Sequence, residues 1–453
     1  MPDAVSATTI LRYLSGDRQA IQSLIECPRA LWLGLIFVIS AGFAREYDAE
    51  SLLHEPWYLL IPVAASLLTS FLLYALLYGA ALSKNVSIRP VAIPSSPDND
   101  VIATLADRPP LRRFWGLYPT FLTLYWMTAP LAWLYAIPVE RFLSPYDAAV
   151  TNYWFLAFVS VWRVLLISRA ASIMFSAPFG LVLCLVLLFA DTVVLVASFT
   201  IPQPVFQVMG GVHHNALEQL NAGISGMSCC FSVLLWPVLF AIATSCFSAQ
   251  GDAWTMPRKR GQPRNVHRSA WMLSACSIVA WAGILPFTQR EQFLRYEVER
   301  ELIYGNLRHG LAMMSERQRV DFPPGWSPPP YWEKRNYEPD FGDVLTAIST
   351  EPVAGWVKDV YWSIAEERFA DASFQWYPGD GHEGDFRAHS VYLDLHPERD
   401  RVIREAAPDM RRYIKWASDS TVDQIAIAEK FKRLLQSLPG EDLLKEPSPE
   451  QHD

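Results

Sequence analysis

Residues 178–200 read PFGLVLCLVLLFADTVVLVASFT, and this stretch decides the fold class. Asp191 is its only charged residue. An α-helix rises about 1.5 Å per residue, so a helix of this length covers the roughly 30 Å hydrocarbon core of a bilayer. The stretch therefore predicts a transmembrane helix.

Six other apolar stretches of similar character lie before residue 288. Together the predicted spans are Pro28–Ala44, Tyr58–Leu82, Trp115–Ile137, Val150–Ser168, Pro178–Thr200, Ile224–Phe247 and Ala270–Phe287. Tryptophans at their edges, such as Trp57 and Trp154, favour the headgroup layer of a membrane. We therefore predict an all-α fold, a polytopic membrane bundle of about seven helices.

Charge divides the chain unevenly. Residues 1–287 contain 17 basic and 15 acidic side chains, whereas residues 288–453 contain 21 basic and 31 acidic ones. Long uncharged apolar runs exclude a nucleic-acid-binding protein, a collagen and a disordered chain. The acidic remainder predicts a separate polar domain after the last span.

These patterns predict five regions in chain order. Residues 1–27 form a cytoplasmic amphipathic arm, and residues 28–288 form the seven-span domain. Residues 289–340 form a juxtamembrane helix and a proline-rich spacer. A small extracytoplasmic α-helical domain follows at residues 341–440, and residues 441–453 form a disordered tail.

The distribution of Lys and Arg predicts the orientation. Fourteen lie in the arm and in the loops after spans two, four and six, whereas the opposite loops hold only Arg45 and Arg141. By the positive-inside rule the N-terminus is cytoplasmic and the C-terminus extracytoplasmic. Since Arg290, Arg295 and Arg300 lie just beyond the last span, that span fits the rule least well.

The C-terminal part reads as helical. Residues 289–320 carry apolar side chains (Leu294, Val298, Leu302, Leu307, Leu311 and Met314) at three- to five-residue steps and predict one amphipathic helix. The proline-rich segment after it predicts a spacer whose Trp326 and Trp332 dock onto the domain. Further helices are predicted at 352–372, 397–417 and 421–438.

Two charged residues lie within predicted spans, Arg163 in the fourth and Asp191 in the fifth. Counting residues places them at similar depth on sequential antiparallel helices. Because an unpaired charge in hydrocarbon is unfavourable, we predict an intramembrane ion pair. One interpretation is a structural pair that fixes the helix hairpin, and the alternative is an ion relay or a contact with a substrate.

Histidines and carboxylates cluster in two places and suit a divalent metal. The first is the outer loops of the membrane part, where His54 follows span one and His213, His214 and Glu218 precede span six. The second is a C-terminal loop that carries His382, His389 and His396. Neither spacing matches a compact metal motif, so solvated polar loops are the simpler interpretation, and no cofactor is predicted.

Motifs of enzymes are sparse. Gly379, Gly381 and Gly384 match GxGxxG, but Asp380 and Glu383 would repel a pyrophosphate, so we interpret the segment as a turn. The six cysteines form no CxxC pair. The sequence has no catalytic signature, which leaves the question of an enzyme open.

From these features we predict a bacterial-type inner-membrane protein whose partners are the bilayer and, through its outer domain, another protein. The expected role is a non-enzymatic accessory, scaffold or sensor subunit. One alternative is a transporter or channel component that uses kinked helices and the Arg163/Asp191 pair. The other alternative is a membrane enzyme with an outer-face His/Glu site.

Overall fold

A computed structural model describes thirteen stretches of the chain. They are residues 4–46, 51–83, 110–139, 142–200, 216–249, 264–304, 306–323, 326–330, 339–370, 388, 391–395, 399–416 and 422–438. Apart from one isolated bridge between Val5 and Val266, the regular structure in these stretches is helical, so the all-α prediction is confirmed. Two compact units result: unit 1 comprises Met1–Gln207 and Asn215–Arg290, and unit 2 comprises Val208–His214 and Glu291–Asp453.

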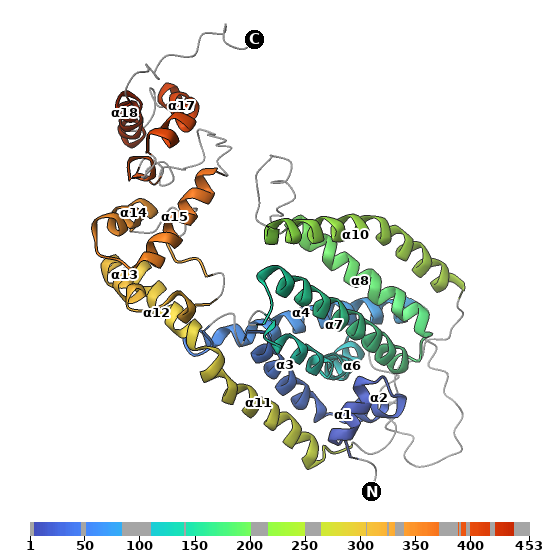
Figure 1. Ribbon diagram of the computed structural model, residues 1–453. Helices are drawn as coiled ribbons and strands as arrows, with labels where there is room; N and C mark the ends of the chain where they lie inside the picture. Colours follow the sequence, from blue (N-terminus) through green and yellow to red (C-terminus); the bar gives the residue numbers. More distant parts are fainter. Residues whose placement is uncertain are drawn as a thin grey trace, which may run out of the picture. The chain divides into compact units, whose positions relative to one another are not determined.

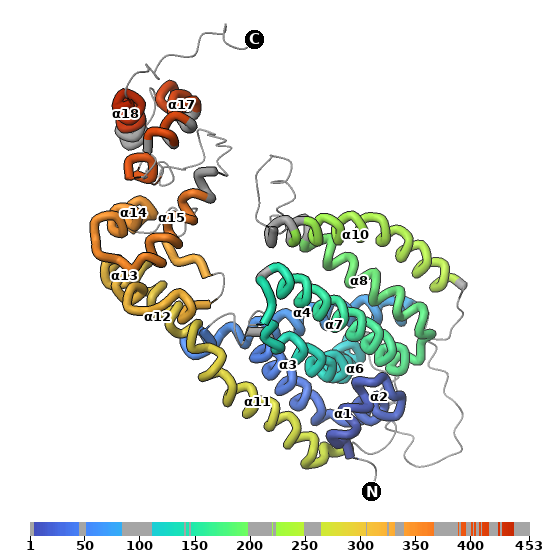
Figure 2. Tube along the Cα trace, viewed as in Figure 1, coloured from blue at the N-terminus to red at the C-terminus, as the bar shows by residue number. Residues whose placement is uncertain are grey.

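Unit 1 is a bundle of mostly long apolar helices (Figure 1). They are α1 (Ala7–Leu14), α2 (Arg18–Ile25), α3 (Ala30–Glu46), η1 (Pro56–Leu59), α4 (Leu60–Ser83), α6 (Pro110–Trp126), η3 (Ala129–Ala136), α7 (Pro145–Met174), α8 (Phe179–Thr200), α10 (Ala216–Ala249) and α11 (Arg268–Thr288). Although distant in sequence, α3 and α11 lie side by side (Figure 2).

Within the described residues, five helices are long and apolar enough to cross a membrane. They contain Pro56–Ser83, Tyr146–Met174, Phe179–Ala197, Gly223–Ser248 and Arg268–Thr288. A sixth span results if α2 and α3 are counted together, although they are bent by 110°. These helices indicate a membrane protein and match the predicted spans two, four, five, six and seven.

The predicted third span is not one helix. The helix α6 ends at Trp126, and the chain continues as the 3-10 helix η3 from Ala129. Pro119 lies inside α6 without ending it, whereas Pro130 lies at the start of η3. Since proline has no N–H and fits the first turn of a helix, Pro130 favours a new start over a continuous helix.

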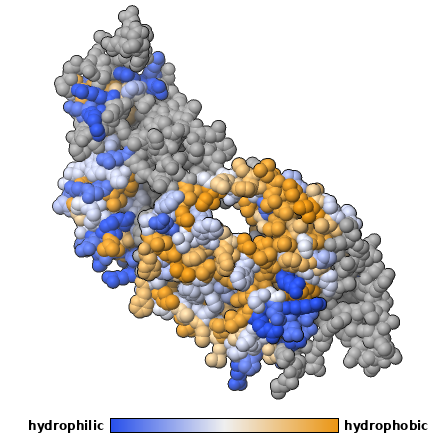
Figure 3. Space-filling model, turned by 45° about the vertical axis from the view of Figure 1, so that its right-hand side comes forward, coloured by the Kyte–Doolittle hydropathy of each residue, from blue (hydrophilic) through white to orange (hydrophobic). Residues whose placement is uncertain are grey.

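The surface of unit 1 is strongly apolar (Figure 3). The side chains of Leu53, Leu60, Trp154 and Leu234 are 66–75% exposed, and most other exposed large apolar side chains of the described residues belong to the same unit. A water-soluble protein seldom exposes so continuous an apolar surface, whereas contact with lipid requires one. The exposed apolar side chains of unit 1 thus agree with the membrane-spanning helices that the hydropathy of the sequence predicts.

An aromatic seam joins α4 to α6. Tyr74 of α4 lies at its centre, 4.8 Å from Phe114 and 5.4 Å from Phe121 between ring centroids. Its hydroxyl donates to the backbone carbonyl of Phe114 at 2.9 Å. Burial of these large rings adds apolar area to the core of unit 1. The hydrogen bond of the Tyr74 hydroxyl also fixes how α4 and α6 align along each other.

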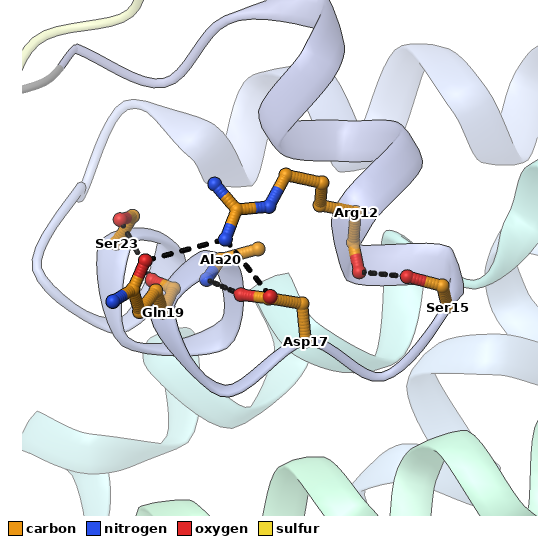
Figure 4. Close-up of polar contacts among 6 residues, drawn as sticks. All are labelled: Arg12, Ser15, Asp17, Gln19, Ala20 and Ser23. Carbon is orange, nitrogen blue, oxygen red and sulfur yellow. Dashed lines mark hydrogen bonds and ion pairs between the residues drawn. The ribbon is translucent and has the colours of Figure 1, made fainter.

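The N-terminal arm folds into the bundle as α1 and α2. Ile10, Tyr13 and Ile21 are fully or almost fully buried in the same hydrophobic core as the long helices. The turn between the helices is held by Asp17, which caps α2 through the N–H of Ala20 at 2.9 Å (Figure 4). Arg12 donates to the other oxygen of Asp17 at 2.9 Å and to Gln19 at 3.2 Å.

A clamp ties this arm to the start of α11. Arg264 donates to the carboxylate of Glu26 at 2.8 Å and to the hydroxyl of Ser23 at 2.9 Å. Backbone bonds join Val5 to Asn265 and to His267. The arm is thus an integral part of unit 1, connected to a segment more than 230 residues later in the chain.

Unit 2 contains seven described helices with bounds, and residues 391–395 are helical as well. The seven helices are α12 (Arg290–Tyr304), α13 (Leu307–Ser315), η5 (Arg319–Asp321), α14 (Phe341–Thr350), α15 (Gly355–Ala370), α17 (Arg399–Trp416) and α18 (Val422–Gln436). Their apolar faces form one core, separate from that of unit 1, in which Leu302, Ile348, Tyr361 and Phe431 are fully buried. The predicted helices at 352–372, 397–417 and 421–438 correspond to α15, α17 and α18.

The predicted single helix at 289–320 is wrong, because it is two helices. The side chain of Asn306 accepts the N–H groups of Arg308 and His309 and so begins α13. The new helix packs on α12 at Gly310, where a Cβ atom would lie 2.7 Å from a methyl group of Leu302. An Asn cap therefore prevails over the continuous apolar pattern.

The proline-rich segment docks as predicted where the structure describes it. Trp326 is buried and stacks on Phe322, with 4.5 Å between ring centroids. Its indole N–H donates to Glu299 of α12 at 2.7 Å. Burial lowers the pKa of Arg319, whose guanidinium donates to the carbonyl of Trp326 at 2.9 Å. Trp332 and the predicted tail at 441–453 lie outside the described residues.

Candidate functional site

The break between α6 and η3 frees a backbone carbonyl in the interior of unit 1. In a continuous α-helix the N–H of Thr128 would bond to the carbonyl of Leu124. Instead it bonds to the carbonyl of Tyr125 at 3.3 Å, in the tighter 3-10 pattern. The Leu124 carbonyl must therefore find another donor, since a buried unpaired carbonyl is costly.

Tyr13 supplies that donor from the N-terminal arm. Its hydroxyl donates to the Leu124 carbonyl at 2.5 Å, and the side chain is fully buried. Burial raises the pKa of this hydroxyl, so it stays protonated and able to donate. The arm thus completes the hydrogen bonding of the broken helix.

Two tryptophans secure the flanks of the break. The indole N–H of Trp126 donates to Ser66 of α4 at 2.9 Å, and that of Trp133 donates to Ser40 of α3 at 3.0 Å. Close packing accompanies these bonds, because a Cβ atom on Gly34 of α3 would lie 2.8 Å from the Cβ atom of Trp126. Side chains on both sides of the break are therefore packed closely against the neighbouring helices α3 and α4.

Arg163 extends from α7 toward this break. Its neighbours on the same face of the helix, at steps of three, four and seven residues, are the buried Val159, Leu166, Ile167 and Ala170. The opposite face, which includes Trp154, Phe158 and Val161, is 54–71% exposed. Arg163 accordingly lies on the face of α7 that packs into the bundle.

The guanidinium group of Arg163 is held at two points. Its Nε donates to the hydroxyl of Thr128 at 3.2 Å, and its Cζ lies 5.3 Å from the centroid of the Tyr125 ring, in cation–π geometry. The Thr128 hydroxyl in turn donates to the carbonyl of Tyr125 at 2.7 Å. Residues of the helix break thus fix the orientation of the cation.

The structure does not bring Arg163 and Asp191 together. No ion pair joins them within the described residues, and the contacts of Arg163 are those with Thr128 and Tyr125. Asp191 is 8% exposed, and its Oδ2 atom is buried without a hydrogen-bond partner. Equal depth on neighbouring helices did not produce the predicted pair, because the guanidinium group of Arg163 contacts Thr128 and Tyr125 at the break after α6.

The residues near Asp191 belong to the contact between α8 and α10. Thr192, the next residue, accepts the indole N–H of Trp236 of α10 at 3.0 Å. Cys184, seven residues before Asp191 and on the same face of α8, packs against the same hydrophobic core as Cys246 of α10. Asp191 is therefore a buried carboxylate on the face of α8 that packs against α10.

Most of the predicted metal ligands lie outside the residues that the structure describes. His54 is described, and its Nδ1 lies 2.9 Å from the hydroxyl of Ser51. The other residues, His213, His214, His382, His389 and His396, and the side chain of Glu218, lie outside the described residues. No group of three or more potential metal ligands occurs among the described side chains. The metal sites remain predictions.

In comparisons with known proteins, no family matches this chain, and neither a curated protein nor a solved structure matches it.

Sequence reasoning found Arg163 but missed the residues that hold it. Thr128 and Tyr125 carry no recognisable motif, and Tyr13 is 111 residues from the carbonyl that it contacts. The signal available was Pro130, whose missing N–H would leave the carbonyl of Trp126 without its partner in a continuous helix and so favours a break nearby. The tertiary structure alone shows that the carbonyl of Leu124 is freed and that Tyr13 supplies its donor.

Proposed function

We propose that the chain is a non-enzymatic accessory, scaffold or sensor subunit of a bacterial-type inner membrane. Unit 1 anchors it in the bilayer, and unit 2 is presented on the extracytoplasmic side to another protein.

One observation carries the proposal. The apolar helix α11 ends at Thr288 and unit 2 begins at Glu291, so two residues separate a candidate span from unit 2. Val298 and Leu302 of α12 already belong to the core of unit 2. A folded polar unit that begins within a few residues of a membrane span is held at the bilayer surface, which suits presentation to a neighbouring membrane protein.

The orientation is tested by cysteine labelling in intact cells. In a chain without its six natural cysteines, Val320→Cys places a thiol on a side chain that is 76% exposed in unit 2. Leu11→Cys places one in the arm, where the leucine is 62% exposed. We expect a membrane-impermeant maleimide to label position 320 in intact cells and position 11 only after lysis. The reverse pattern would contradict the proposed orientation.

The role is tested by purification from the native membrane in mild detergent, followed by quantitative mass spectrometry. We expect a partner at fixed stoichiometry whose amount falls with Tyr304→Ser or Val320→Ser, since these are the most exposed large apolar side chains of unit 2 among the described residues. Leu11→Ser is the matched control in the arm. Recovery of the chain alone, at full yield, would contradict an accessory role.

A second function, a transporter or channel component, is favoured by Asp191. A buried carboxylate oxygen without a partner in a membrane helix is typical of ion and proton pathways. Purified protein in liposomes would then show an ion or proton flux that Asp191→Asn abolishes. Asp147→Asn, at the exposed start of α7, is the control, and equal flux with all three proteins would exclude this function.

A further inference from the structure

We infer that Arg163, held by Thr128 and Tyr125 at the helix break, binds the phosphate group of a ligand. The inference goes beyond the proposed function, because it assigns a binding site inside unit 1. It rests on the direction of the side chain, its depth, its charge and its free donors.

The terminal nitrogens of Arg163 are free to bind. Within the described residues only Nε donates a hydrogen bond, and neither Nη atom is among the buried atoms without a partner. Both Nη atoms are therefore accessible, although the side chain lies on the bundle-facing side of α7. A guanidinium group held at Nε presents its two Nη atoms as a planar fork, which matches two oxygens of a phosphate.

The charge of Arg163 is not balanced by a described carboxylate. Asp191, the acidic residue at similar depth, is not paired with it, and the other direct contacts are a hydroxyl and an aromatic ring. A cation in an apolar bundle is unfavourable unless it is neutralised or hydrated. An anionic ligand removes that cost, which favours an oxyanion over a neutral or cationic molecule.

The depth of Arg163 favours phosphate as that oxyanion. The neighbouring Trp162 donates its indole N–H to the carbonyl of Leu14 at 2.9 Å, at the end of α1. Six residues further along α7, Arg169 lies beside Gly16. This part of α7 therefore runs along the polar arm, whose Arg12 and Asp17 are at least 31% exposed.

The apolar stretch of α7, Tyr146–Met174, has 29 residues, or about 43 Å, and exceeds the roughly 30 Å of hydrocarbon. If the arm lies outside the hydrocarbon, Arg163 is level with the headgroups of that leaflet. Phosphate is the anion that is concentrated there. The ligand is thus either an anionic phospholipid that inserts its headgroup or a soluble phosphate compound that enters from the same side.

The test is a binding measurement on the full-length protein, purified in detergent and stripped of lipid. The probes are dioctanoyl phosphatidic acid, dioctanoylglycerol as the phosphate-free lipid, and inorganic phosphate. The variants are Arg163→Gln and Arg163→Lys, together with Thr128→Val, which removes the hydroxyl that holds Nε. Arg169→Gln is the matched control, since it removes the same charge from an exposed position of the same helix.

We expect phosphatidic acid to bind the wild-type protein and dioctanoylglycerol to bind much more weakly. Arg163→Gln weakens binding of phosphatidic acid roughly 10-fold or more, as expected for loss of a charge-assisted bidentate contact. Arg169→Gln leaves it within about twofold. If inorganic phosphate binds as tightly as phosphatidic acid with the same dependence on Arg163, the site takes a soluble phosphate and not a lipid.

Equal affinity of the wild-type protein and Arg163→Gln for both phosphate probes would overturn the inference. If Arg163→Gln fails to fold, the affinities of Arg163→Lys and Thr128→Val for the phosphate probes test the inference instead. Lysine keeps the charge but lacks the fork, and valine removes the hydroxyl that orients it. Each is expected to weaken binding roughly threefold or more, and unchanged affinity in both would equally overturn the inference.

Discussion

The hydroxyl of Tyr13 donates a hydrogen bond to the backbone carbonyl of Leu124 at 2.5 Å, and so joins the first helix of the chain to the break after α6. Tyr13 is fully buried. The Leu124 carbonyl is available because the N–H of Thr128 bonds to the carbonyl of Tyr125 instead. One side chain therefore links the polar arm, the broken segment and the neighbourhood of Arg163.

Tyr13→Phe is expected to lower the free energy of unfolding by about 1–2 kcal/mol. The substitution removes the donor and leaves the Leu124 carbonyl buried and unpaired. Thermal unfolding in one detergent, followed by intrinsic fluorescence, measures the effect. Tyr304→Phe is the control, because Tyr304 is 83% exposed. Equal stability of Tyr13→Phe and wild type would mean that water or another group replaces the hydroxyl.

Gly34→Ala is expected to destabilise unit 1 by about 1–3 kcal/mol. The added Cβ atom would lie 2.8 Å from the Cβ atom of Trp126, so α3 and α6 must separate. Gly79→Ala in α4 is the control, since a Cβ atom there meets nothing within 4 Å. Alanine favours a helix by up to about 1 kcal/mol over glycine, so the control should be neutral or slightly stabilised. Similar behaviour of both variants would contradict close packing at the break.

The clamp between Arg264 and Glu26 is expected to show a coupling energy of about 0.5–1 kcal/mol. Both side chains are 25% exposed, and their charged atoms lie 2.8 Å apart. A double-mutant cycle with Glu26→Gln and Arg264→Gln measures it, and the coupling should shrink as salt is added. The more exposed pair of Arg12 and Asp17 serves as the comparison and should couple less. A coupling near zero would assign the connection to the backbone bonds alone.

The arm is expected to loosen in acid because of Asp17. Its pKa is lowered by the backbone N–H of Ala20 and then by the guanidinium group of Arg12. A carboxyl with a lowered folded-state pKa contributes its stability above the unfolded value of about 3.9 and loses it as the pH falls through the folded value. The protection factor of the Ala20 amide, which is its exchange rate in the unstructured chain divided by that in the protein at the same pH, should therefore fall below about pH 4.

Asp17→Asn separates this effect from general acid unfolding. Asparagine caps a helix nearly as well but carries no carboxyl to titrate. The protection factor of the Ala20 amide in this variant should change less between neutral and acid pH. The same fall of the protection factor in acid in the variant and in the wild type would show that other groups control the arm.

Much of the bundle could be predicted from hydropathy alone, and the reason is visible in α8. Its stretch 178–200 is apolar over the length of a bilayer, and no tertiary contact is needed to make it a helix. In unit 2, α13 and α14 begin at Asn306 and Asp340, whose side chains cap them. The prediction of one helix at 289–320 was wrong because a local signal competes there with a long apolar pattern: the side chain of Asn306 begins α13 within that pattern.

The candidate site could be predicted only in part. The sequence by itself determined the apolar helices, the charge asymmetry and the presence of Arg163 and Asp191 within spans, because composition and periodicity are local properties. Only the tertiary structure decided that Arg163 contacts Thr128 and Tyr125 and that the Oδ2 atom of Asp191 has no hydrogen-bond partner among the described residues. The rotation of each helix about its axis sets those contacts, and that rotation depends on how α6 breaks and on the arm that packs against it.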